Sequence, residues 1–121
     1  MKVIYIAGRY RASCEWELET FLRKAEDAAI KLWSEGWAVI CPHKNTAHFG
    51  GANGIEDQVW LNGDLEILKR CDAIYMLDNW RESSGAKIER EHAIFNNLDI
   101  YYEDMKDHAV DWRADNKGCA S

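Results

Sequence analysis

The chain has 121 residues, a net charge of −6 and 47% hydrophobic residues. This length suits one domain with a core and is too short for two, and the acidic balance argues against a surface that tracks the phosphates of DNA or RNA. No stretch reaches the roughly 18 apolar residues of a membrane span. Because the first residues already read as a strand, we expect no signal peptide and a cytoplasmic location.

The first half of the chain alternates predicted strands with predicted helices. A continuous β-branched and aromatic run predicts a buried strand at Val3–Ala7. After a tight turn, apolar residues at helical spacing predict a long amphipathic helix, which Ser13 caps and Gly36 ends. A second strand follows at residues 37–41, and Pro42, the only proline, closes it.

The second half begins with the longest irregular segment, residues 43–54, which we expect to be a lid or a substrate loop. Its G-G-x-x-G spacing lacks the lysine and hydroxyl of a phosphate-binding loop. The elements predicted after it are a helix at 55–70 that Gly63 kinks or divides, a strand at 73–77, a helix at 86–98, a short strand at 100–102 and one helical turn within 105–112. We therefore expect one domain over residues 1–113, followed by a frayed tail at 114–121.

This alternation of strands and helices predicts an α/β fold with a parallel sheet, right-handed crossovers and helices on both faces. The expected class is a single-domain, Rossmann-like or flavodoxin-like three-layer sandwich with four or five parallel strands. In such sheets ligands bind outside the carboxyl ends of the strands, near the switch in strand order. Three segments gather at this edge, residues 8–11, 42–54 and 78–84, and we expect the functional site there.

Two of these segments have groups that suit an anion. The segment after the third predicted strand ends in Ser83-Ser84-Gly85 and opens a helix, and a helix N-terminus favours an anionic ligand. In the turn that begins at Gly8, Arg9 and Arg11 could each hold a phosphate bidentately. The alternative, at even odds, is that both arginines are ordinary surface residues.

Three aromatic side chains lie where a planar base could stack: Tyr5, Tyr10 and Trp80. Tyr5 alternates within a buried strand, so a core position explains it equally well.

The helix after Gly85 has two candidate carboxylates that periodicity does not separate. On a helical wheel its core-facing arc is formed by large apolar residues, namely Ile88, Ile94, Phe95 and Leu98. Glu89 falls beside this arc and Glu91 falls within it, so the wheel chooses neither. Asp64, in the preceding helix, is a second acid, and two carboxylates across a cleft would permit nucleophile and proton-donor roles. For each of them a solvated or capping position is the alternative.

The cysteine pattern favours no metal. The four cysteines, Cys14, Cys41, Cys71 and Cys119, are far apart and form no C-x-x-C pair. A zinc site from Cys41, His43 and His48 is conceivable, but the spacing fits no finger pattern. We expect no metal site and no cofactor.

The stretch S-S-G-A-K-I-E-R-E-H-A at Ser83–Ala93 resembles the signature of the nucleoside 2-deoxyribosyltransferase-like superfamily. In that signature an Asp or Ser, a Gly, a Glu and an Ala form a fixed frame, and the matching residues here are Ser83, Gly85, Glu89 and Ala93. The opening I-Y-I-A-G and the segment at 62–73 resemble the first strand and the Asp-bearing helix of the superfamily. The resemblance covers roughly residues 3–102, nearly the whole domain.

The resemblance implies roles for these residues. Glu89 matches the nucleophile that attacks C1′ of the sugar, and Asp64 matches the acid that assists the leaving base. Ser83 and Arg11 match phosphate-binding positions of the nucleoside 5′-monophosphate N-glycosidase branch, whereas nucleoside transferases tend to have Asp in place of Ser83. The substrate-binding residues expected from both arguments are Gly8, Arg9, Tyr10, Arg11, Trp80, Ser83 and Gly85.

The implied activity is hydrolysis of the N-glycosidic bond of (2′-deoxy)nucleoside 5′-monophosphates. The expected partners are a small-molecule nucleotide or nucleoside and further copies of the chain, in a homodimer or larger homo-oligomer, with no nucleic acid and no membrane. One alternative is a transferase that moves deoxyribose between bases. Another is a nucleotide-binding module without catalytic turnover.

Overall fold

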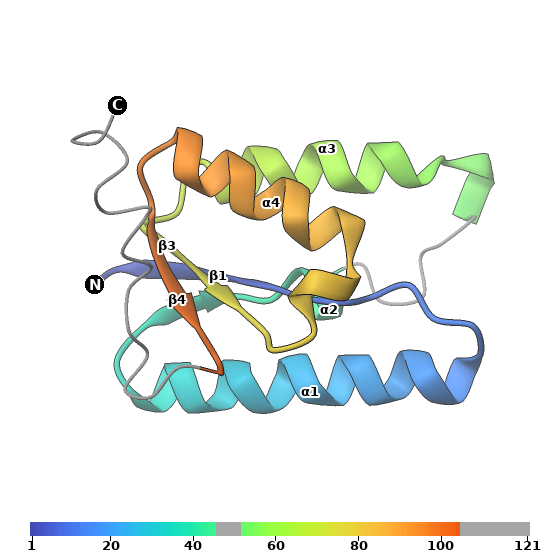
Figure 1. Cartoon of the computed structure of the whole chain (residues 1–121), viewed down its shortest axis with the longest axis horizontal. Coiled ribbons are helices and arrows are strands. Elements are labelled where there is room, and N and C mark those ends of the chain that lie inside the picture. The colour runs from blue at the N-terminus through green and yellow to red at the C-terminus, as the bar shows by residue number, and fades with distance from the viewer. Residues whose placement is uncertain (46–51, 105–121) are drawn as a thin grey trace.

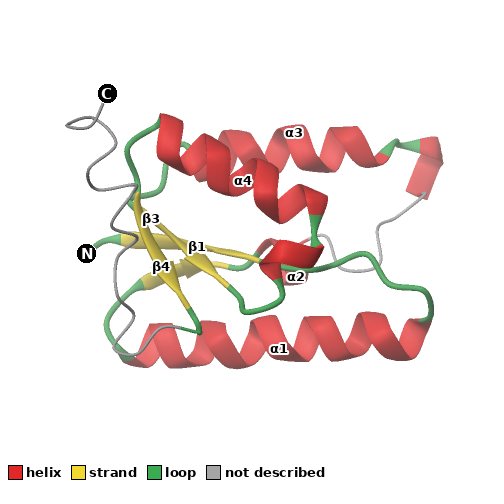
Figure 2. Cartoon of the chain, viewed as in Figure 1, coloured by secondary structure: helices red, strands yellow, loops and turns green. Residues whose placement is uncertain are grey.

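The computed structural model describes residues 1–45 and 52–104, and its sheet has four parallel strands in the order β2-β1-β3-β4. The elements are β1 (Val3–Ala7), α1 (Glu15–Ser34), β2 (Ala38–Ile40), α2 (Pro42–Asn45), the 3-10 turn η1 (Ala52–Gly54), α3 (Asp57–Leu68), β3 (Ala73–Met76), the 3-10 turn η2 (Trp80–Glu82), α4 (Ser84–Phe95) and β4 (Asp99–Tyr102). Helix α1 covers one face of the sheet, and α3 and α4 cover the other (Figures 1 and 2). The predicted α/β three-layer class is confirmed.

Each face of the sheet builds its own core because successive side chains of a strand point to opposite faces. Tyr5 and Ala7 of β1 point toward α4, and they pack with Ile74 and Met76 of β3. The alternate residues, which include Ile4 and Ile6, pack with the apolar face of α1. Because β1 and β3 lie in the middle of the sheet, they are buried on both faces, which explains their continuous apolar sequences.

The ends of α1 differ in how well they were predicted. Gly36 follows the helix with a φ of +98°, in the left-handed region that favours glycine, so the predicted C-terminal signal is confirmed. The N-cap is Cys14 and not Ser13, and the Cys14 side chain makes no capping hydrogen bond. Ser13 instead donates from its N–H and its hydroxyl to Oε1 of Glu17, at 2.8 and 3.2 Å. Ser13 thus donates to a first-turn glutamate and does not cap the helix.

Two predictions about the middle of the chain are wrong. The segment expected to be irregular from residue 43 begins instead within the one-turn helix α2, which Pro42 starts after β2 has ended at Ile40. A proline is tolerated there because its missing N–H is not needed at the start of a helix. Gly63 neither kinks nor divides α3, which runs through it from Asp57 to Leu68. The rest of the predicted loop at 43–54, apart from η1, lies outside the described residues, as do the predicted turn at 105–112 and the tail at 114–121. The boundary at residue 113 therefore stays a prediction.

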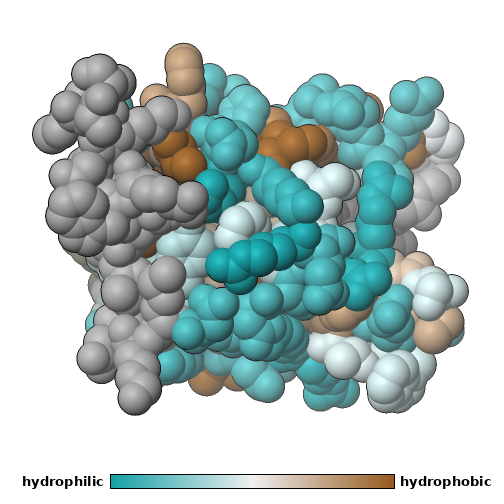
Figure 3. Space-filling model, in the orientation of Figure 1, coloured by the Kyte–Doolittle hydropathy of each residue, from teal (hydrophilic) through white to brown (hydrophobic). Residues whose placement is uncertain are grey.

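The inward face of α4 matches the predicted one only in part: Leu98 lies in the core cluster and Ile94 packs against it as predicted, but the other two residues of the predicted arc are exposed. Its buried residues are Ala86, Glu89, Arg90 and Ala93, at i, i+3, i+4 and i+7 spacing. Ile88 and Phe95, which the wheel placed toward the core, are 39% and 79% exposed. Two alanines lie on the side toward the sheet, so the helix can approach it closely, and the long side chains of Glu89 and Arg90 reach into the interior. The described residues of the face in Figure 3 are mostly hydrophilic, with hydrophobic residues in small separate groups.

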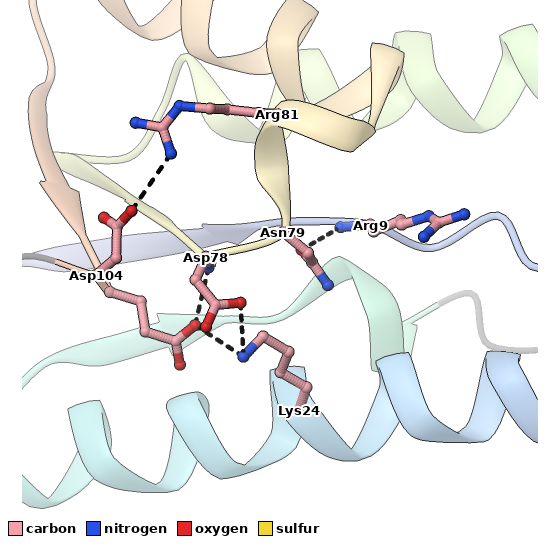
Figure 4. Close-up of polar contacts among 7 residues, drawn as sticks. Arg9, Lys24, Asp78, Asn79, Arg81 and Asp104 are labelled. Atoms are coloured by element: carbon pink, nitrogen blue, oxygen red, sulfur yellow. Dashed lines mark hydrogen bonds and ion pairs between the residues drawn. The ribbon is translucent and has the colours of Figure 1, made fainter.

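Charged side chains hold the segment between β3 and α4 in place (Figure 4). Lys24 of α1 donates to Oδ1 of Asp78 at 2.9 Å and to Oε1 of Glu103 at 3.1 Å. The same Glu103 oxygen accepts the backbone N–H of Asp78 at 2.9 Å. Farther along the segment, Arg81 pairs with Asp104 at 3.3 Å. The segment that leads into α4 is therefore tied to α1 and to the end of β4.

Candidate active site

A pocket of about 780 Å³ lies at the carboxyl ends of the strands, between the turn after β1 and the helices α3 and α4. This volume is in the range of small-molecule sites, roughly 300–1,000 Å³. Of the sequence-predicted site residues, eight line it: Gly8, Arg9, Tyr10, Arg11, Asp64, Ser83, Gly85 and Glu89. Parallel strands and their short connections thus bring together residues that lie up to 81 positions apart in the chain, from Gly8 to Glu89.

Glu89 is a buried carboxyl group within this lining. Its residue is only 8% exposed, and its Oε2 accepts a hydrogen bond from the hydroxyl of Tyr5 on β1. Burial raises the pKa of Glu89 to about 8, with a further increase from the nearby charge of Asp64, while the Tyr5 hydrogen bond acts in the opposite direction. Burial and the Glu89 charge raise the pKa of Tyr5 well above its usual value, so Tyr5 stays a neutral donor.

Asp64 projects into the same pocket from α3. Burial raises its pKa to about 6. Of the two carboxyl groups, Glu89 therefore has the higher pKa and takes up a proton before Asp64 does as the pH falls. Two carboxyl groups in one pocket with different pKa values can supply one carboxylate and one carboxylic acid, the two forms that nucleophilic and acid catalysis need.

The start of α4 also lines the pocket. Ser83 is the N-cap, and its Oγ accepts the N–H of Ala86 at 3.0 Å. The N–H groups of the first turn, those of Ser84 and Gly85, have no intrahelical acceptor. A Cβ added to Gly85 would meet only Ser83 Oγ, at 3.8 Å, so the Gly85 backbone is open toward the pocket. This arrangement suits an anionic group of a ligand.

The turn after β1 is held by two residues that the sequence reasoning did not assign to the site. Asn79 Oδ1 accepts the N–H of Arg9 at 2.9 Å (Figure 4), and Nε2 of the buried His43 lies 3.1 Å from the carbonyl oxygen of Arg9. Burial lowers the pKa of His43, so the ring is neutral near pH 7. Gly8 lies directly against Leu77, and an added Cβ would be 2.5 Å from Leu77 Cδ1.

Both arginines of this turn are paired with carboxylates of the pocket lining. Arg9 Nη1 lies 3.2 Å from Glu82 Oε2, and the Arg9 guanidinium lies 4.9 Å from the centre of the Phe21 ring. Arg11 Nη2 lies 2.8 Å from Asp57 Oδ2. Each guanidinium therefore already has a carboxylate partner.

Trp80 does not line the pocket, and its predicted role as a wall for a base is not what the structure shows. The indole is buried in the core cluster beneath α4, 6.0 Å from the ring of Tyr102. Arg90 lies over it at 5.2 Å and donates from Nε to the Tyr102 hydroxyl at 2.7 Å. A large aromatic ring beside a buried guanidinium contributes more as packing than it would as an exposed stacking surface.

Sequence signals for the missed residues were present but weak. A tyrosine at the centre of a buried strand needs a hydrogen-bond partner for its hydroxyl, and this requirement could have linked Tyr5 to a buried acid. An Asn directly after a strand and a His directly after a proline are common in loops, so Asn79 and His43 had no distinguishing pattern. Within residues 1–45 and 52–104, no three His, Cys, Asp or Glu side chains cluster as a metal site would require.

We expect Tyr5→Phe to raise the pKa of Glu89 further, because it removes the hydrogen bond that favours the ionised carboxylate. The expected change is about a tenfold increase in proton affinity, equivalent to one hydrogen bond to a charged group. A carbon-13 NMR titration of the glutamate carboxyl groups measures it. Tyr75→Phe is the matched control, since Tyr75 lies in the core on the other face of the sheet, and an unchanged Glu89 titration in Tyr5→Phe would contradict the assignment.

Fold and pocket together define a small α/β domain with a pocket at the carboxyl ends of its strands. The family described as "Domain of unknown function (DUF4406)" matches residues 2–102, and the chain belongs to this family. No curated protein matches the chain. No helix in the described part of the chain is long and apolar enough to cross a membrane.

One similar solved structure is that of a 2-deoxyribosyltransferase from the psychrotolerant bacterium Bacillus psychrosaccharolyticus. The two chains share 21% sequence identity with a TM-score of 0.59, and the match covers 83% of this chain and 70% of the transferase chain. At this identity the likeness shows that the two proteins have the same fold.

Proposed function

We propose that the protein hydrolyses the N-glycosidic bond of (2′-deoxy)nucleoside 5′-monophosphates and releases the free base and the sugar 5-phosphate. The observation that carries the proposal is the buried Glu89 carboxyl group, which accepts the Tyr5 hydroxyl hydrogen bond and shares its pocket with Asp64. A carboxylate that burial makes less stable in its charged form gains most from forming a covalent ester, in which the charge disappears.

The proposed reaction has two steps. In the first, a Glu89 oxygen bonds to C1′ while the C1′–N bond breaks, and the departing base takes its electron pair and a proton from Asp64. In the second, water attacks C1′, Asp64 takes a proton from that water, and Glu89 leaves as the carboxylate. Because the pKa of Glu89, about 8, lies above that of Asp64, about 6, the proton lies mainly on Glu89 near pH 7. The first step requires the less populated state in which Asp64 holds this proton, and the Tyr5 hydroxyl favours that state by donating to the Glu89 carboxylate.

The phosphate part of the proposal is supported by the start of α4. Ser83 Oγ accepts the Ala86 N–H as a cap, so its own hydroxyl proton remains available to a phosphate oxygen. Ser84 and Gly85, whose N–H groups begin the helix, line the pocket together with Ser83. A serine at the cap, in place of an aspartate, also adds no negative charge next to the phosphate.

A second candidate is a transferase that moves deoxyribose from one base to another, and the activity of the fold relative favours it. The same Glu89 ester would then react with an incoming base instead of water. A third candidate is a nucleotide-binding module without turnover. The expected cytoplasmic location and homo-oligomeric state also remain proposals.

The test is a panel of nucleosides and nucleoside 5′-monophosphates incubated with the protein and analysed for free base by chromatography. Base release from monophosphates in preference to nucleosides is expected. A new nucleoside or nucleotide on addition of a second free base would identify the transferase instead. Binding of the panel compounds without base release would leave the non-catalytic module as the function.

We expect Gly85→Ala to stabilise the protein while it weakens the binding of monophosphates. Alanine has the higher helix propensity, by about 0.5–1 kcal/mol, and the added methyl group meets no protein atom closer than 3.8 Å. The methyl group would project instead at a phosphate held on the first turn of α4. Urea unfolding and monophosphate KM measure the two effects, and an unchanged KM in a stabilised variant would contradict the proposed phosphate position.

A further inference from the structure

Two ion pairs at the pocket rim occupy the cationic groups that the substrate phosphate would need. Arg9 pairs with Glu82 of η2, and Arg11 pairs with Asp57 at the first turn of α3. All four residues line the pocket. Any phosphate that binds an arginine there must displace a carboxylate or share the guanidinium with it.

The two pairs differ in how easily they can open. Arg9 is held by its backbone bond to Asn79 and by the Phe21 ring, and its side chain is 34% exposed. The side chains of Arg11 and Asp57 are 77% and 55% exposed, so water can replace each partner. Asp57 also lies in the first turn of α3, where the positive end of the helix dipole stabilises a carboxylate without any arginine. The Arg11–Asp57 pair is the one that can exchange at low free-energy cost.

We propose that Asp57 is a specificity-determining residue that competes with the phosphate of the substrate for Arg11. This inference rests on the proposed function, because it requires a ligand with a phosphate group. In the free protein Asp57 holds Arg11 at the rim, and in the complex the phosphate takes its place. The Asp57 carboxylate then remains in the lining as a like charge, which disfavours phosphate-bearing ligands relative to the same ligands without phosphate.

The expected effect is modest and can be measured. An exposed ion pair contributes up to about 1 kcal/mol, which corresponds to about a fivefold change in a dissociation constant. We therefore expect Asp57→Asn to tighten the binding of 2-deoxyribose 5-phosphate by about two- to fivefold and to leave the binding of 2-deoxyribose unchanged. Both probes lack a base, so the measurement does not depend on which base the protein accepts.

The experiment is isothermal titration calorimetry of both probes with wild type, Asp57→Asn, Arg11→Gln and the double variant. In the Arg11→Gln background the added Asp57→Asn change should have little effect, since a true competition disappears when the contested group is absent. Glu66→Gln is the matched control, because Glu66 is also an exposed, ion-paired carboxylate of α3 but does not line the pocket.

The outcomes separate this inference from the proposed function. Weaker or unchanged binding of 2-deoxyribose 5-phosphate by Asp57→Asn, with measurable binding by the wild type, overturns the inference and leaves the proposed substrate class standing. Equal tightening in the Arg11→Gln background also overturns it, since the effect would then be general charge repulsion. If neither wild type nor Asp57→Asn binds the phosphate probe, both the inference and the assignment of monophosphates as substrates are wrong.

Discussion

Replacing Glu89 with glutamine is expected to abolish base release and, above pH 5, to make the folded protein more stable. Glutamine keeps the shape of the side chain and can accept the Tyr5 hydroxyl hydrogen bond, but it cannot form the ester at C1′. The loss of a covalent nucleophile should reduce kcat by at least about a thousandfold. Both effects follow from removal of the buried Glu89 carboxylate, because its charge supplies the nucleophile and also destabilises the fold.

The pH dependence of this stability difference follows from the direction of the pKa change. The Glu89 carboxyl group titrates near 4.5 in the unfolded chain and near 8 in the folded protein, so the folded state binds more protons between these values. The wild type therefore loses stability as the pH rises from about 4.5 to 8, whereas Glu89→Gln lacks this loss. We expect the two proteins to be equally stable near pH 4 and to differ in free energy of unfolding by about 2–4 kcal/mol at pH 8. This difference is below the maximum that a pKa change from 4.5 to about 8 allows.

Urea unfolding from pH 4 to pH 8 measures the stability difference, and chromatography of released base measures the activity. Glu91→Gln is the matched control: it lies two positions further along α4, its side chain is 70% exposed, and it should behave like the wild type in both assays. Base release that survives in Glu89→Gln would refute Glu89 as the nucleophile. A stability difference that does not grow with pH would refute its buried, protonated state.

Gly8→Ala is expected to destabilise the protein by about 2–3 kcal/mol, a typical cost of overpacking a closed core. The new Cβ would lie 2.5 Å from Leu77 Cδ1, 2.8 Å from Leu77 Cβ and 3.0 Å from Asn79 Oδ1. Leu77 is fully buried in a core cluster, so a shift of its side chain would disturb the residues packed around it. The end of β1 would have to shift away from the end of β3, and the turn with Arg9 would shift with it.

Gly63→Ala provides a control of opposite sign. Gly63 lies inside α3, and an added Cβ would have no atom within 4 Å, so alanine should stabilise the helix by about 0.5–1 kcal/mol. The free energies of unfolding in urea compare the two variants at one pH. If Gly8→Ala were as stable as the wild type, the close approach of β1 and β3 at this turn would be wrong.

The order of strands and helices was predictable because strand and helix residues follow different apolar periods. Val3–Ala7 and residues 73–77 are continuous apolar runs, which only the inner strands of a parallel sheet require. Local rules failed where another local contact competed. Ser13 was expected to accept a hydrogen bond as the N-cap of the helix, but it donates to the Glu17 side chain instead. Pro42 follows the end of a strand, as expected, and also begins a helix.

The face of α4 shows why periodicity was insufficient for the site. A wheel assigns the large apolar residues to the core, but Ile88 and Phe95 are exposed, and the buried positions belong to two alanines, Glu89 and Arg90. The interior partners of the two charged residues come from the sheet, from Tyr5 of β1 and Tyr102 of β4. These partners lie 84 and 12 positions away in the chain, so no pattern within the helix could reveal the Tyr5 contact.

The sequence by itself determined the α/β class, the order of the elements and the segments that meet at the carboxyl ends of the strands, because these depend on local periodicity and on parallel topology. Only the tertiary structure decided which carboxylate is buried, since burial depends on the small residues that let α4 approach Tyr5. The tertiary structure also shows that Trp80 lies in the core, where the sequence predicted a site residue, and that Arg11 pairs with Asp57. Those contacts join residues far apart in the chain, and their free energies come from burial and charge in the assembled domain.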